Sequence, residues 1–187
     1  MKLTEGHEID KFVVKTGNDY FALTVRLPTK KDATKVRRCI ESIIGREENV
    51  RFFRTVTQKG QEQFMEETLQ KLKKKRELFV VGEVEGKIVM IAALMKGDFK
   101  VDEHVADFVI GIMGSYRGKG IGTKVTESLF SIAPQIGIRV IRSSYEEGNY
   151  DIRNFYKKLG FSEIGKMPHG RRLKGKLFDE VIVVKKL

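Results

Sequence analysis

The sequence predicts a mixed α/β fold, in which one mixed, mostly antiparallel sheet carries helices on both of its faces. Apolar, β-branched runs of strand length recur along the chain, and segments with apolar residues at helical spacing interrupt them. The order of these segments contains both hairpins and a β-α-β crossover. Because strand and helix do not alternate regularly, a doubly wound parallel sheet is not expected.

The first half of the chain contains two predicted hairpins separated by two helices. Thr29, with Asp32 three residues later, gives a weak form of capping box at the start of the first helix, and Gly45 ends that helix. In order, we expect strands over 9–15 and 20–27 with turn residues 16–19 between them, helices over 30–44 and 58–75, and strands over 78–84 and 87–95. The basic run 71–76 closes the second helix, where cations suit the helix dipole, and we interpret it as a solvated face.

The second half contains the predicted crossover and a last pair of strands. In order, we expect a strand over 104–113, a glycine-rich loop over 114–122, a helix over 121–133, a strand over 138–145, a helix over 149–159, and strands over 161–165 and 177–185 that flank a basic loop over 167–175.

Composition sets limits on the class of protein. The 187 residues are enough for one domain with a sizeable core, and 41% hydrophobic with 33% charged residues is a globular balance. A single cysteine, Cys39, excludes a disulfide framework within the chain and a cysteine-based zinc site, and the histidines show no metal spacing. No apolar run reaches 18 residues and residues 1–10 lack the apolar core of a secretory signal, so we expect a cytoplasmic protein without a membrane span.

The formal net charge is +11, from 36 basic and 25 acidic side chains. Such a surface attracts polyanions, which include nucleic acids and phosphorylated cofactors, but the charge alone does not choose between them. The chain lacks the interleaving of aromatic and basic residues that is typical of RNA-binding surfaces.

The glycine-rich segment is the strongest local signal in the sequence. It follows an apolar strand, precedes a helix, and comprises Arg117, Gly118, Lys119, Gly120, Ile121, Gly122 and Thr123. A helix N-terminus offers unpaired N–H groups, and glycines let the backbone approach an anion, so this pattern favours a diphosphate site. The segment does not match the P-loop pattern, and Thr123 stands where a dinucleotide fingerprint needs glycine or alanine.

A second motif follows at residues 149–161, where Asn149, Tyr156, Gly160 and Phe161 stand at the spacing N-x₆-Y-x-K-x-G-F. Together with the pattern [QR]-x-x-G-x-[GA] that starts at Arg117, it resembles the GNAT superfamily of N-acetyltransferases. The similarity in element order extends over nearly all of the chain. The resemblance implies one domain over 1–187, with 1–19 as an extension and 20–187 as the core.

The resemblance also implies where acetyl-CoA binds. The sheet of this family splays between the fourth and fifth core strands, and the pantetheine arm pairs there with strand backbone. By this resemblance Ile110 and Ile112 offer backbone groups, and Asn149 contacts the arm. The loop from Arg117 through Gly118, Lys119, Gly120, Ile121 and Gly122 to Thr123 holds the pyrophosphate.

Tyr156 matches the position of the family's frequent general acid. Thiolate leaves when an amine attacks the thioester, and a phenol can donate a proton as charge develops on sulfur. The general base stays open. The family often has a glutamate where this chain has Ala106, and the alternatives are Glu103, His104, Asp107 or water.

The expected activity is transfer of an acetyl group to a primary amine, by direct attack in a ternary complex. The acceptor, a small-molecule amine, a polyamine or a protein N-terminus or lysine, stays open. Glu47 and Glu48 would suit a cationic amine, but we interpret them as solvated residues, whereas Arg171, Arg172 and Lys174 suit an acidic acceptor or the phosphate of the cofactor. A homodimer is an expectation of the family. Two alternative functions stay open, that of a basic nucleic-acid-binding module and that of a catalytically idle acyl-CoA-binding regulator.

Overall fold

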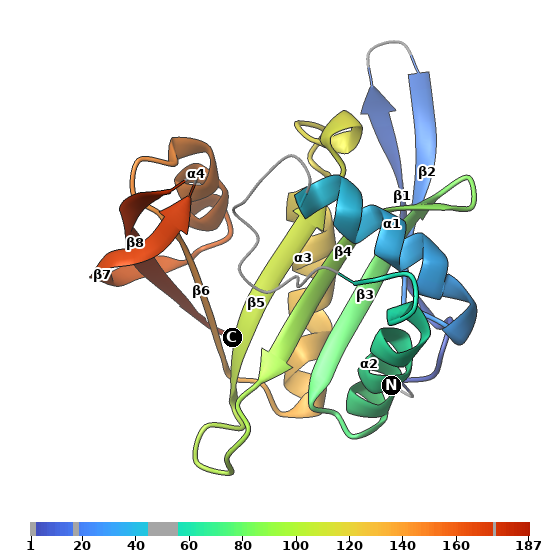
Figure 1. Cartoon of the computed structure of the whole chain (residues 1–187), viewed down its shortest axis with the longest axis horizontal. Helices are drawn as coiled ribbons and strands as arrows, with labels where there is room; N and C mark the ends of the chain where they lie inside the picture. Colours follow the sequence, from blue (N-terminus) through green and yellow to red (C-terminus); the bar gives the residue numbers. More distant parts are fainter. Residues whose placement is uncertain (1–2, 17–18, 45–55, 174) are drawn as a thin grey trace.

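The computed structural model describes residues 3–16, 19–44, 56–173 and 175–187, and its centre is a single eight-stranded sheet (Figure 1). The strand order is β1-β2-β3-β4-β5-β6-β8-β7, and every neighbouring pair is antiparallel except β5 and β6. The strands are β1 (Glu8–Thr16), β2 (Asp19–Arg26), β3 (Glu77–Val84), β4 (Lys87–Lys96), β5 (Val105–Ile112), β6 (Val140–Glu146), β7 (Ser162–Leu173) and β8 (Lys176–Lys186). The predicted mixed, mostly antiparallel sheet is therefore confirmed.

Helices cover both faces of the sheet. In Figure 1, α1 and α2 lie in front of β3 and β4, and α3 lies behind them. The helices are α1 (Ala33–Ile44), α2 (Gln61–Lys73), α3 (Ile121–Ile132) and α4 (Tyr150–Lys158), with short 3₁₀ turns η1 (Lys30–Asp32), η2 (Gly114–Tyr116) and η3 (Ala133–Ile136). Because β3 and β4 are covered on both sides, nearly all of their residues are buried, which explains their continuous apolar runs.

The start of the first helix is held by the predicted pair of residues. The hydroxyl and the backbone N–H of Thr29 both donate to the carboxylate of Asp32, at 3.0 and 2.7 Å. Asp32 is 3% exposed and also binds the Arg26 guanidinium, which bonds Glu83 of β3 as well. This network joins β2, β3 and the N-terminal end of α1.

β5 and β6 form the one parallel pair of the described sheet, and they pair over three residues only. The register joins Val105 to Val140, Ala106 to Ile141 and Asp107 to Arg142. Beyond this point β5 continues to Ile112 and β6 to Glu146 without pairing, and Figure 1 shows the two strands diverging. The sheet thus forks between the fourth and fifth core strands, as the resemblance predicts.

The C-terminal hairpin differs from the sequence-based expectation. Residues 167–175 were expected to form a basic loop, but β7 runs through them to Leu173. β7 is an edge strand and is exposed along most of its length, so its polar residues need no alternating pattern. The register shifts between Met167 and Arg171, where a Cβ on Gly170 would lie 2.7 Å from the Glu180 Cβ. Close approach of the two strands therefore requires glycine there.

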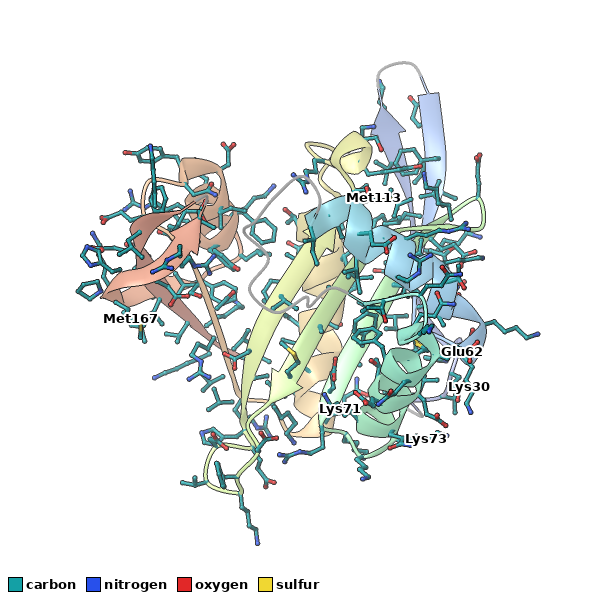
Figure 2. The ribbon with its side chains drawn as sticks, in the orientation of Figure 1. Lys30, Glu62, Lys71, Lys73, Met113 and Met167 are labelled. Carbon is teal, nitrogen blue, oxygen red and sulfur yellow. The ribbon has the colours of Figure 1, made fainter. Side chains whose placement is uncertain are left out.

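The second helix is shorter than expected, since α2 begins at Gln61 and ends at Lys73. Lys71 and Lys73, labelled on α2 in Figure 2, have side chains that are 60% and 69% exposed, which confirms the solvated basic face. Some predictions fall outside the described residues: the centre of the predicted turn at 17–18, the helix end at Gly45, the acceptor candidates Glu47 and Glu48, and Lys174.

Candidate active site

The glycine-rich loop joins the end of β5 to α3. Gly118 and Gly120 have φ of +71° and +73°, and Gly120 is the N-cap of α3. A Cβ at either position would meet nothing within 4 Å. The backbone conformation therefore requires glycine, and the space beside it is open, as an anion cradle needs.

The cations of the loop are tied to its own backbone. Arg117 Nε donates to the Ile112 carbonyl at 2.9 Å, and Lys119 Nζ donates to the Ser115 carbonyl at 2.8 Å. The Lys119 ammonium also lies over the ring of Tyr116, 5.7 Å from the centroid. These contacts engage both cations with backbone carbonyls and hold the loop in shape.

The mouth of the fork is a cavity of about 730 Å³. Met113, directly after β5, and Met167, on β7, are labelled in Figure 2, and neither residue lines this cavity. The predicted site residues that line this cavity are Ile110, Ile112, Arg117, Gly118, Gly120, Gly122, Thr123, Asn149 and Tyr156. Lys119 and Ile121 do not line it, and the Ile121 side chain is buried in the core at 1% exposure.

The edge of β5 that faces the cavity presents alternate residues. In a strand both backbone groups of one residue point to the same side. The Phe108 carbonyl accepts from Ser143 of β6 and the Ile112 carbonyl accepts from Arg117, so both point into the fork. By the same alternation Ile110 also directs its N–H and C=O there.

Tyr156 of α4 places its phenol at the apex of the fork. The side chain is 7% exposed, and its hydroxyl lies 2.6 Å from the Ser143 hydroxyl. Three rings surround it: Tyr145 stacks on it, while Phe155 and Phe161 meet it edge to face. Burial raises the pKa of Tyr156, an effect that the Ser143 hydrogen bond and the positive charge of Arg171 oppose. The phenol is therefore protonated at neutral pH.

Asn149 has a local role in the structure. Its Oδ1 accepts the Ile152 N–H at 3.2 Å and so caps α4, and its Nδ2 donates to Glu146 at 2.9 Å. It also lines the cavity, in the region where the resemblance places the pantetheine arm.

The candidates for the general base lie at the closed end of the fork. Glu103 and His104 are exposed in the turn before β5, and Ala106 is fully buried. The carboxylate of Asp107 makes two bonds, at 2.7 and 2.9 Å, to the Arg142 guanidinium. None of these four residues lines the cavity as the described residues define it. Water therefore stays as the prediction for the base.

A buried ionic cluster on the far wall was not foreseen from the sequence. Arg171 of β7 bonds Glu180 at 3.3 Å and lies 3.7 Å from Glu146, and its guanidinium also donates to the Ser144 carbonyl at 2.8 Å. Glu180 is 1% exposed. Arg171 therefore does meet acidic groups, but they are two carboxylates of the same chain, those of Glu146 and Glu180. A glutamate next to the apolar run 181–184 was the available signal.

Neither a candidate metal site nor a membrane-spanning helix is found among the described residues. Over the described ranges of the chain, no three His, Cys, Asp or Glu side chains gather in a way that holds a metal ion. Among the helices of the described residues, none combines the length and apolar character that crossing a bilayer requires.

Comparison with known proteins identifies the family. The family model described as "Acetyltransferase (GNAT) family" matches residues 45–161, which is more than half of the chain and includes the glycine-rich loop and α4.

Individual relatives agree with this match. "Putative phosphinothricin acetyltransferase YwnH" of Bacillus subtilis is 32% identical over 82 residues, a match that covers 44% of this chain and 50% of the relative. The crystal structure of a protein described in the same terms is 27% identical, with a TM-score of 0.75 over 88% of this chain and 98% of that one. YncA of Salmonella typhimurium, solved with acetyl-CoA, has a TM-score of 0.77 at 19% identity over 88% and 94% of the two chains. The chain, which spans half the length of the curated relative it matches, belongs to the GNAT acetyltransferase family.

Proposed function

We propose that this protein is an acetyl-CoA-dependent N-acetyltransferase that acts on a primary amine. One observation carries the proposal. A single cavity brings together a forked strand edge, a left-handed glycine loop at a helix N-terminus and a buried phenol. Each of the three parts suits one portion of the reaction, and both motifs of the family contribute to it.

The open edge of β5 and the loop suit the two ends of the cofactor. The loop has open space beside Gly118 and Gly120, where the N–H groups of residues 118–123 would hold a diphosphate together with the dipole of α3. Ile110 and Ile112 would pair with the amide groups of the pantetheine arm as an added strand does. Acetyl-CoA then supplies the activated thioester at the apex of the fork.

Tyr156 suits the role of general acid. Its hydroxyl lines the cavity at the apex, and burial keeps it protonated at neutral pH. In the proposed reaction the amine attacks the thioester directly in a ternary complex, and Tyr156 gives its proton to the departing sulfur. The chain's part is to orient the two substrates, exclude water and hold this proton.

The acceptor is proposed at the level of a primary amine. Two relatives carry the name of phosphinothricin acetyltransferase, so phosphinothricin belongs in the first panel of acceptors. Because Arg171 is already paired with Glu146 and Glu180, an acidic acceptor gains no free cation from it. The panel should therefore include amino acids, simple amines, polyamines and peptides.

The test measures binding and turnover separately. Calorimetry gives the affinity for acetyl-CoA, and release of free CoA thiol gives turnover with each amine. Tyr156→Phe should keep the affinity and lower kcat by about 10² to 10⁴, while Tyr20→Phe, at a 64% exposed tyrosine of β2, should change neither. Binding without turnover on any amine would favour an idle regulator, and absence of binding would overturn the proposal.

Three expectations about the whole protein remain proposals. We propose that residues 1–187 act as one transferase domain, with 1–19 as an extension and 20–187 as the core. We also propose a cytoplasmic location and a homodimer, without a role for nucleic acid.

A further inference from the structure

Two hydroxyl groups meet at the apex of the fork, and only one of them belongs to the family motif. Ser143 of β6 is 6% exposed, and its Oγ lies 2.9 Å from the Phe108 carbonyl and 2.6 Å from Tyr156 Oη. It follows directly after Arg142, the last residue of β6 that pairs with β5. Ser143 thus bridges the two strands where their backbones separate.

The direction of this chain of hydrogen bonds follows from counting protons. A carbonyl can only accept, so the single hydroxyl proton of Ser143 is donated to Phe108. Tyr156 must then be the donor in the contact between the two hydroxyls. In this arrangement the phenol proton points at Ser143 and not into the cavity.

We propose that Ser143 is the positioning residue for Tyr156, and that its hydroxyl reverses direction during acetyl transfer. The inference rests on the proposed function. Before transfer Ser143 accepts a hydrogen bond from the phenol O–H and holds Tyr156 in place. During transfer the phenol O–H turns from Ser143 to the sulfur and gives up its proton. The Ser143 hydroxyl then turns from the Phe108 carbonyl and donates to the phenolate.

The step balances as follows. The amine nitrogen forms a bond to the acetyl carbon, and the carbon–sulfur bond breaks with its electron pair on sulfur. The Tyr156 proton moves to that sulfur, which gives the free CoA thiol and a phenolate. The surplus proton of the new amide nitrogen passes to water, and water returns a proton to the phenolate.

A serine suits this exchange because a hydroxyl can both accept and donate, whereas a carboxylate only accepts. The neighbouring Tyr145 shows the contrast. Its hydroxyl donates to Glu163 at 2.8 Å, and burial together with that carboxylate raises the pKa of Tyr145 to about 12. A phenolate beside Glu163 would be repelled, so Tyr145 is not suited to give up its proton.

The other charged groups around Tyr156 leave the role to Ser143. Arg171 favours the phenolate, but Glu146 and Glu180 neutralise it. A small pocket on the other side of the ring is lined from α4, β6, β7 and β8 by Arg153, Lys157, Tyr145, Glu163 and Val183. Of these, Arg153 and Glu163 pair with each other at 2.9 Å. Ser143, in contrast, hydrogen-bonds the phenol oxygen itself.

The test follows the ionisation of Tyr156 directly. Replacing all five tyrosines with 3-fluorotyrosine acidifies the phenols and brings their titration into an accessible pH range, and ¹⁹F NMR resolves each one. Tyr156→Phe identifies the resonance. Ser143→Ala should raise the pKa of that phenol by about one to two units, since it removes a hydrogen bond to the charged form. Ser143→Thr, which keeps the hydroxyl, should restore the value.

Ser131→Ala is the matched control, because Ser131 is exposed on α3 and donates to the Ser128 carbonyl, away from the cavity. It should leave the titration unchanged. If Ser143→Ala does not fold, Ser143→Cys, which nearly keeps the shape, takes its place. A pKa of residue 156 that is the same in wild type and in the hydroxyl-free variant would overturn the inference.

Kinetics separate this inference from the proposed function. Ser143→Ala should lower kcat about tenfold with an unchanged KM for acetyl-CoA, and Ser143→Thr should recover most of the loss. If the titration shifts but Tyr156→Phe keeps full activity, Tyr156 is not the acid and the reversal is overturned with it. If Tyr156→Phe abolishes turnover while Ser143→Ala changes neither titration nor kcat, the acid role stands and the role of Ser143 fails.

Discussion

Replacing Gly120 with glutamate tests the diphosphate cradle on which the proposed function depends. Gly120 has a φ of +73° and precedes α3, and a Cβ there has nothing within 4 Å. The new side chain therefore enters open space beside the loop backbone. We expect the Gly120→Glu variant to fold and to lose acetyl-CoA binding.

The two effects differ in size. A non-glycine residue in the left-handed region costs about 1–2 kcal/mol of folding free energy. A carboxylate about 5 Å from two phosphate charges opposes binding by about 2 kcal/mol if screened as in water, and by about 7 kcal/mol at an effective dielectric constant of about 20. These values correspond to a loss of affinity between about 30-fold and about 10⁵-fold. Contact between the side chain and the ligand adds to this loss.

Gly175→Glu is the matched control. Gly175 lies in the turn between β7 and β8, has a φ of +77°, and also has nothing within 4 Å of an added Cβ. The two variants therefore share strain, charge and open space, but Gly175 does not line the cavity. Chemical denaturation should show similar losses of stability, and calorimetry should show weak acetyl-CoA binding for Gly120→Glu alone. Equal affinities for the two variants would refute the cradle.

Three further predictions concern other parts of the structure. Arg26→Met leaves the carboxylate of Asp32 buried without its guanidinium and should cost about 3 kcal/mol in denaturant titrations at neutral pH. Burial raises the pKa of Asp32, but Arg26 and the hydrogen bonds at the helix start more than offset this effect and hold the pKa below its ordinary value. The stabilisation from Asp32 is therefore present above the ordinary carboxyl pKa and is lost as pH falls through the folded-state pKa. The cost of Arg26→Met should shrink in that acid range. Asn149→Ala should cost about 1 kcal/mol because α4 loses its cap, while Asn149→Ser, which can still cap the helix and places no second carboxylate beside Glu146, should recover most of that loss. Burial raises the pKa of the Cys39 thiol to about 12, so a disulfide reagent should label the chain only after denaturation.

The sequence predicts correctly those parts of the fold that depend on residues close together along the chain. The pair Thr29 and Asp32 was found because a capping box joins residues three apart. Its third partner, Arg26, had no such signal, although it makes the strongest contacts of the network. The basic stretch 167–173 was expected to be a loop, because an exposed edge strand lacks the alternation by which strands are recognised.

The candidate site divides in the same way. The loop and α4 were found from short motifs, since glycine spacing and an asparagine-to-tyrosine spacing are local. Ser143 carries no signal of its own, because a single serine in a strand is common, and its importance arises only when the fork brings Phe108 and Tyr156 to it. The pairing of Arg171 with Glu180 depends likewise on the register of β7 and β8.

In the proposed reaction the fork also separates cofactor binding from chemistry. The proposed diphosphate cradle belongs to β5 and α3, while the phenol, its aromatic surroundings and the Arg171 cluster belong to β6, α4 and the last hairpin. The two halves of the cavity are joined at the apex by three residue pairs of backbone, by the ion pair between Asp107 and Arg142, and by Ser143. Changes in the loop should therefore alter affinity with little effect on the titration of Tyr156, and changes at Tyr156 should alter turnover with little effect on affinity. Ser143 touches both halves, but its hydroxyl contacts Phe108 and Tyr156 and not the glycine-rich loop, so its replacement should lower turnover and leave the affinity for acetyl-CoA unchanged.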